Sequence, residues 1–141
     1  MEIRTYQMTE HLFLNKSREF NQMSKIVVIG GSRGIGLETV KTLLHQGHHL
    51  TLFSRGARNV NLSAVNLRLF PGDALNEADV NAAIEGKDAV VQTLGVPADY
   101  RLLSGSIDLF SSATKTLISA METKNIRRLL TVTGFGAGDS Y

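Results

Sequence analysis

The 141-residue chain contains no cysteine, and it has no apolar run of the ~18 residues that a membrane-spanning helix needs. The first absence excludes disulfides and thiolate chemistry, and the second argues against a membrane protein. The formal net charge is only +2, and no block of lysine and arginine is interleaved with aromatic residues. The composition therefore predicts no nucleic-acid partner and favours one globular domain.

Residues 1–24 differ from the rest of the sequence. They lack the basic start and apolar core of a secretory signal, so we expect a cytoplasmic protein. Met23 opens the stretch "MSKIVVIGG", which has the form of a natural start. We therefore expect residues 1–24 to be a partly disordered N-terminal extension, with a short amphipathic helix as the alternative. Residues 25–141 are expected to form the domain.

Apolar runs and helical periodicity alternate along residues 25–136. This alternation predicts an α/β fold with a parallel sheet and right-handed crossovers. The segment "GARNVNLSA" at 56–64 is too short for a full helix, so a turn or a degenerate helix is expected there. The predicted strands are 25–30, 49–55, 65–70, 88–95 and 127–136, and the predicted helices are 35–44, 76–84 and about 106–124.

Three glycines stand between the first predicted strand and the first predicted helix. Glycine permits a sharp turn and a close approach of backbone to a pyrophosphate, and a helix N-terminus attracts an anion. The alternative is a plain left-handed turn, where glycine is favoured anyway. The residues assigned to the dinucleotide by this hypothesis are Gly30, Ser32, Arg33, Gly34, Ile35 and Gly36.

An arginine ends the second predicted strand, where dinucleotide folds meet the adenosine ribose. No Asp or Glu occurs between Thr51 and Asn66, so the carboxylate that would bind the 2′-hydroxyl of NAD is missing. Arg55 and Arg58, together with Arg33, could instead converge on the 2′-phosphate of NADP. NADP is therefore the expected cofactor and NAD the less favoured one, while solvated surface charge is the alternative.

The ends of the third and fourth strands supply further candidates. Asp73 could accept a hydrogen bond from the adenine amino group, with Ala74 packed on the ring, or Asp73 could only cap a turn. Leu94 and Gly95 would let the backbone pass close to the cofactor ribose, or they could be a simple strand exit. His45, His48 and His49 have no carboxylate nearby, so we expect no metal site there.

The stretch "IGGSRGIG" resembles the TGxxxGxG fingerprint of short-chain dehydrogenases/reductases, with Ile29 where Thr is usual. The further pattern "FSR", "GDAL", "DAVVQTLGV" and "RRLLTVTGFGAGDS" is similar to the atypical NAD(P)H-binding, NmrA-like group, which includes flavin/biliverdin reductase. The resemblance covers residues 25–141. It implies a Rossmann-type, doubly wound parallel sheet of strand order 3-2-1-4-5.

The sequence departs from that group in two respects. It stops after the fifth strand, so it is expected to lack the last strands of the family fold, and a fragment of a longer reductase is an open alternative. The Tyr-x-x-x-Lys pair is absent, and Thr133 stands where many relatives have a catalytic Ser. Thr133 is the candidate hydroxyl donor, and a buried strand residue is the alternative.

The resemblance implies an NADP(H)-binding oxidoreductase domain that transfers hydride to a small-molecule acceptor. The alternatives left open are a non-catalytic NADP-sensing module and an inactive fragment of a longer reductase. The fifth predicted strand would leave an open edge, so we expect the chain either to self-associate through that edge or to be only marginally folded.

Overall fold

The computed structural model describes residues 23–94 and 105–132, with residues 105–109 described by their backbone alone. Five strands form one parallel sheet in the order β3-β2-β1-β4-β5. This order confirms the predicted Rossmann-type α/β fold. The strands are β1 (Lys25–Ile29), β2 (His49–Ser54), β3 (Leu67–Pro71), β4 (Ala89–Gln92) and β5 (Leu129–Thr131).

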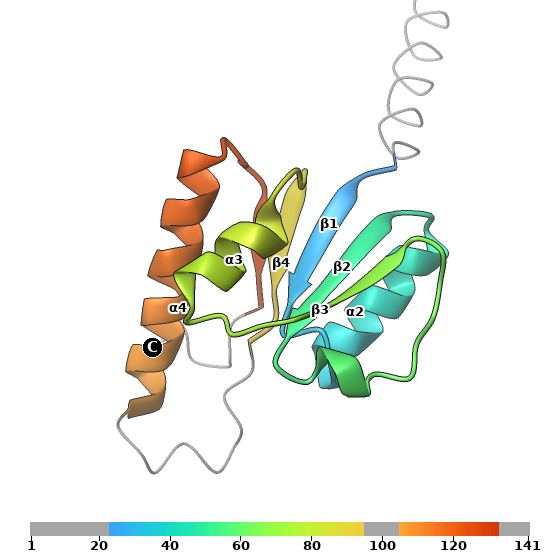
Figure 1. Ribbon diagram of the computed structural model, residues 1–141, viewed down its shortest axis with the longest axis horizontal. Helices are drawn as coiled ribbons and strands as arrows, with labels where there is room; N and C mark the ends of the chain where they lie inside the picture. The colour runs from blue at the N-terminus through green and yellow to red at the C-terminus, as the bar shows by residue number, and fades with distance from the viewer. Residues whose placement is uncertain (1–22, 95–104, 133–141) are drawn as a thin grey trace, which may run out of the picture.

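Helices cover both faces of the sheet (Figure 1). One face carries α2 (Gly34–His45) and the short 3₁₀-helix η1 (Ala57–Asn59), which occupies part of the segment expected to be a turn or a degenerate helix. The other face carries α3 (Glu77–Ile84) and α4 (Gly105–Thr123). The side chain of Asn76, the N-cap of α3, accepts a hydrogen bond from the Asp79 N–H.

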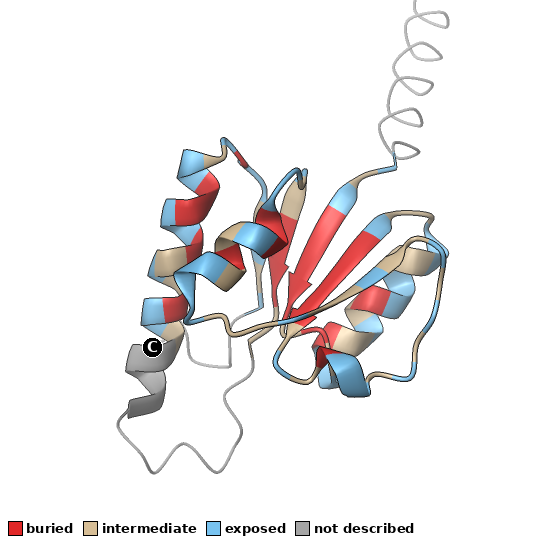
Figure 2. Ribbon diagram, in the orientation of Figure 1, coloured by how far each residue is buried: buried red, intermediate tan, exposed pale blue. Residues whose placement is uncertain are grey.

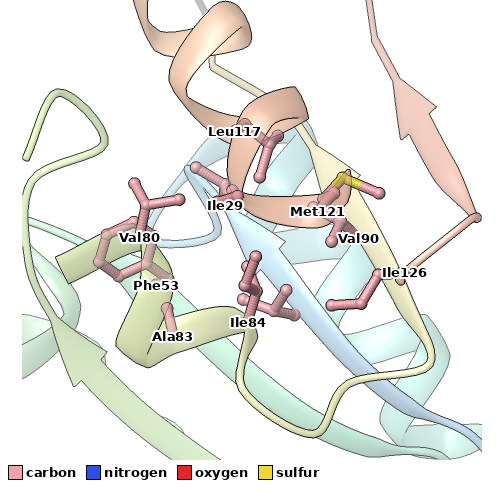
Figure 3. Close-up of a cluster of buried hydrophobic side chains, with 11 residues drawn as sticks. Ile29, Phe53, Val80, Ala83, Ile84, Val90, Leu117, Met121 and Ile126 are labelled. Carbon is pink, nitrogen blue, oxygen red and sulfur yellow. The ribbon is translucent and has the colours of Figure 1, made fainter. Parts of the chain in front are cut away.

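The central strand β1 is buried from Ile26 to Ile29, because both faces of the sheet are covered there (Figure 2). Successive side chains of a strand point to opposite faces, so the strand feeds two separate cores. Val28 packs toward α2 with Leu52, whereas Val27 packs toward α3 and α4. Figure 3 shows this second core, to which β2 contributes Phe53 and α4 contributes Leu117.

The carboxyl ends of the three central strands lie at the same end of the sheet, its carboxyl edge, as distinct from the outer strands β3 and β5. In the register, Ile29 of β1 is the partner of Phe53 on β2 and of Gln92 on β4. The chain leaves β1 toward β2 and β3, and later returns to β4 and β5 on the other side of β1. Ligands of doubly wound folds bind at such a reversal of strand order.

Three predicted strands were longer than the observed ones or are only partly described. The fourth ends at Gln92 rather than at residue 95, because Thr93 and Leu94 already lie outside the strand. The third strand begins at Leu67 rather than at residue 65, because Val65 stands in a turn and is fully exposed. Of the predicted fifth strand, residues 129–131 form β5, and residues 133–136 lie outside the described residues. Leu130 and Val132 are 63% and 37% exposed. Within the two described ranges, no helix is long and apolar enough to cross a membrane.

Candidate functional site

The turn between β1 and α2 requires glycine at two positions. Gly30 has φ +86° and Gly34 has φ +55°, a left-handed conformation that other residues adopt only with strain. The Gly30 N–H donates to the Phe53 carbonyl at 2.9 Å, so the turn starts from the carboxyl edge of the sheet. The sequence-predicted glycine turn therefore lies at the reversal of strand order.

Gly36 brings the first turn of α2 into direct contact with that turn. It is buried, and a Cβ atom added there would lie 2.5 Å from the Thr93 hydroxyl oxygen and even closer to the Gly30 carbonyl oxygen. No side chain fits at this position. The backbone of α2 therefore packs against Gly30 and against the residue that follows β4.

Thr93 joins the end of β4 to the end of β1. Its N–H donates to the Ile29 carbonyl at 2.8 Å, and its hydroxyl donates to the same oxygen at 3.0 Å. Thr93 was not among the predicted site residues. One feature of the sequence could have indicated this role. Thr93 carries a hydroxyl and directly follows the fourth strand, which the order 3-2-1-4-5 places beside the first strand and its glycine turn.

The N-terminus of α2 is free to receive an anion. Arg33 occupies the N-cap position in an extended conformation and makes no side-chain capping bond, and the first turn contains no acidic residue. The first N–H groups of a helix have no partner within the helix and carry partial positive charge. Arg33 and Gly34 are exposed, and Ile35 is 65% exposed, so this end of the helix faces solvent.

The turn that follows β2 lies beside the glycine turn. A Cβ atom at Gly56 would be 3.5 Å from the Ser32 hydroxyl, and the Gly56 N–H donates to the Ser54 hydroxyl at 3.0 Å. The turns at Ser32 and Gly56 are therefore neighbours, and these turns carry Arg33, Arg55 and Arg58. All three arginines are exposed, and none forms an ion pair with a residue that the structure describes.

Asp73 lies at the carboxyl end of β3, one strand further along the same edge. Its carboxylate accepts a hydrogen bond from the Leu75 N–H at 3.0 Å, and its own N–H donates to the Asp79 carboxylate at 2.9 Å. This geometry is a capped turn that leads into α3. Ala74 is partly buried against the core beneath α3. A contact of either residue with adenine stays a prediction.

Leu94 is the last described residue after β4, and it packs partly buried against the same core. Its backbone nitrogen would be 3.2 Å from a Cβ atom at Gly30, so it too borders the glycine turn. The predicted site residues Gly95 and Thr133 lie outside the described residues. Their roles stay predictions.

The opposite, amino-terminal edge of the sheet carries a concentration of basic side chains. Burial lowers the pKa of Lys87, the nearby charges of Arg68 and Lys25 lower it further, and Asp88 partly offsets them. The Nδ1 atom of His48 accepts a hydrogen bond from the Ser24 N–H. Across residues 23–94 and 105–132, no cluster of histidine and acidic side chains could hold a metal ion.

The parallel sheet, the reversal of strand order and the glycine turn at an uncapped helix define a Rossmann-type dinucleotide-binding domain. A family model described as NAD(P)H-binding matches residues 30–141. The chain belongs to this NAD(P)H-binding family. This match agrees with the NAD(P)H-binding resemblance of the sequence.

Carbonyl reductase family member 4 of Danio rerio is 30% identical over 118 residues, which are 77% of this chain and 48% of the relative. The chain spans less than half the length of the curated relatives that it matches.

Two solved structures have a similar fold. One is a wide-type short-chain dehydrogenase/reductase from Veillonella parvula in complex with NADP, with TM-score 0.65 and 22% identity. This likeness covers 82% of this chain and 49% of that one. The other is WbmG from Bordetella bronchiseptica in complex with NAD, with TM-score 0.68 and 18% identity. It covers 78% of this chain and 37% of that one.

Proposed function

We propose that this chain is the NADP(H)-binding domain of an oxidoreductase that reduces a small organic acceptor. The observation that carries the proposal is the uncapped N-terminus of α2, set against a left-handed glycine turn in which Gly36 leaves no room for a side chain. Backbone N–H groups and helix dipole at this point favour a pyrophosphate. When bound, the nicotinamide supplies the hydride, and the protein orients it and excludes competing reactions.

The choice of NADP over NAD rests on the loop that follows β2. Arg55 stands at the end of β2, and no carboxylate occurs from Thr51 to Asn66 to bind a free 2′-hydroxyl. The turn at Ser32, which precedes Arg33, is a neighbour of the turn at Gly56, which follows Arg55. The similar solved structures include complexes with each cofactor, so they do not decide between NADP and NAD.

Calorimetric titration with NADPH and NADH tests this choice. A charge-assisted contact to the 2′-phosphate is worth about 1.5–3 kcal/mol, which predicts a roughly 10- to 100-fold tighter Kd for NADPH. Arg55→Gln should remove most of this preference. The matched control is Arg127→Gln, because Arg127 is also exposed but precedes β5 at the opposite edge of the sheet. Equal affinity of the unmodified chain for both cofactors would refute the assignment of NADP.

Oxidation of NADPH with a panel of flavins, quinones and aldehydes tests the reaction. Acceptor-dependent loss of NADPH, abolished when Gly36 is replaced, would support hydride transfer by this chain. Tight binding with no oxidation for any acceptor would refute it in favour of the NADP-sensing module. An unmodified chain that is folded but binds neither dinucleotide would refute both.

A further inference from the structure

We propose that Thr93 is a positioning residue for the dinucleotide site, and that its hydroxyl group sets the affinity of that site. The hydroxyl holds the Ile29 carbonyl and thereby fixes the turn that presents the N-terminus of α2. This inference rests on the proposed function. In this proposal, the residue that follows β4 supports pyrophosphate binding. Thr93 does so through the glycine turn, without itself contacting the cofactor.

Two donors from one residue fix the orientation of a single peptide group. The N–H and the hydroxyl of Thr93 approach the Ile29 carbonyl oxygen at 2.8 and 3.0 Å. That carbonyl belongs to the peptide unit whose N–H is the N–H of Gly30, which donates to the Phe53 carbonyl at 2.9 Å. Both sides of the peptide are therefore held just before the chain enters the left-handed turn.

Thr93 also contacts the turn and the helix sterically. A Cβ atom added at Gly36 would lie 2.5 Å from the Thr93 hydroxyl oxygen. A Cβ atom added at Gly30 would lie 2.9 Å from the Thr93 carbonyl oxygen. Protein interiors are packed too densely for one such neighbour to move alone. A displacement of the Thr93 side chain would therefore shift the first turn of α2, whose N–H groups would face the anion.

The role of Thr93 differs from that of an ordinary core hydroxyl. Thr114 offers the comparison, since its hydroxyl accepts a hydrogen bond at 3.0 Å from the buried Gln92 side chain, one residue away from Thr93. That bond joins α4 to the sheet on the face away from α2. Loss of the Thr114 hydroxyl should lower stability and leave the glycine turn unchanged.

The test compares Thr93→Ser with Thr93→Ala, because these variants differ only by the hydroxyl oxygen. The Kd for NADPH is measured by the fluorescence of the reduced cofactor, well below the melting temperature of each variant. One lost hydrogen bond predicts an affinity about three- to tenfold weaker for Thr93→Ala, and an affinity within about twofold of the original for Thr93→Ser. Thr114→Ala, the control, should melt earlier and keep its Kd.

Two further readouts separate positioning from stability. Hydrogen exchange of the amides at residues 30–36, measured without cofactor, should be faster in Thr93→Ala than in Thr93→Ser. The ratio of the Kd values for NADH and NADPH should not change, because both cofactors contain the same pyrophosphate. If the unmodified chain binds NADPH and Thr93→Ala binds it equally well, this inference is wrong and the proposed function stands. If the unmodified chain binds neither cofactor, the proposed function is wrong and this inference with it.

Discussion

Replacing Gly36 by alanine places one methyl group at the contact between α2 and the glycine turn. The new Cβ atom would lie 2.5 Å from the Thr93 hydroxyl oxygen, at least about 0.5 Å inside the 3.0 Å limit of real Cβ contacts. The Gly30 carbonyl oxygen lies closer still, and as a backbone atom it cannot rotate away. The start of α2 must therefore move outward by a comparable distance.

This movement should change the stability of the fold little, but it should change the hydrogen-bond geometry of the binding site substantially. Overpacking typically costs ~1–3 kcal/mol against a total stability of ~5–15 kcal/mol, so the variant should fold. Charge-assisted hydrogen bonds have a narrow range of about 2.7–2.9 Å, and a shift of about 0.5 Å takes an N–H group out of it. Each such bond lost weakens dinucleotide binding about 10- to 100-fold. Gly36→Val, which is bulkier, should abolish measurable binding.

Calorimetric titration with NADPH, together with circular dichroism and thermal melting, measures both effects. Gly86→Ala is the matched control, because Gly86 has φ +66° and open space around it. That variant acquires ~1–2 kcal/mol of left-handed strain without a clash, so it should melt earlier and keep its affinity. A folded Gly36→Ala chain that binds NADPH as tightly as the unmodified chain would show that the turn is not the binding site.

Three further predictions concern other parts of the molecule. Lys87→Met should raise the melting temperature at neutral pH. The pKa of Lys87 is lowered in the folded state, so the unmodified chain should gain stability as the pH rises through that lowered pKa toward 10.5, and the variant should not. Self-association through the β5 edge stays a prediction, which light scattering tests: Leu130→Lys should reduce it without lowering the melting temperature, since Leu130 is 63% exposed. Asn76→Ala removes the cap on the Asp79 N–H and should cost about 1 kcal/mol in denaturant unfolding, whereas Asn76→Asp should cost much less.

The sheet could be predicted from the sequence because its strands carry local signals. The run around Val27 and Val28 is apolar and β-branched, as a strand covered on both faces requires, and both residues are buried. The start of β3 was misplaced because Val65 has the side chain of a strand residue but the backbone of a turn. Hydrophobic pattern alone does not distinguish these two cases.

The glycine turn was predictable because its residues are close in sequence. Gly30, Gly34 and Gly36 have a recognisable spacing between a strand and a helix. The hydroxyl of Thr93 bonds to Ile29 across 64 residues, and no local pattern encodes that contact. Part of the reason why Gly36 must lack a side chain is the contact with Thr93 after β4, which only the folded structure gives.

The central position of β1 has a consequence for the order of folding. The Ser24–His48 hydrogen bond beside the β1–β2 pair spans 24 residues, whereas the Ile29–Thr93 bond to β4 spans 64. By loop-closure entropy the longer loop costs about 0.9 kcal/mol more to close, so the β1–β2 half is expected to form first. The glycine turn is then completed only when β4 docks on that half, late in folding. A dinucleotide that binds the completed turn should therefore slow unfolding more than it speeds folding.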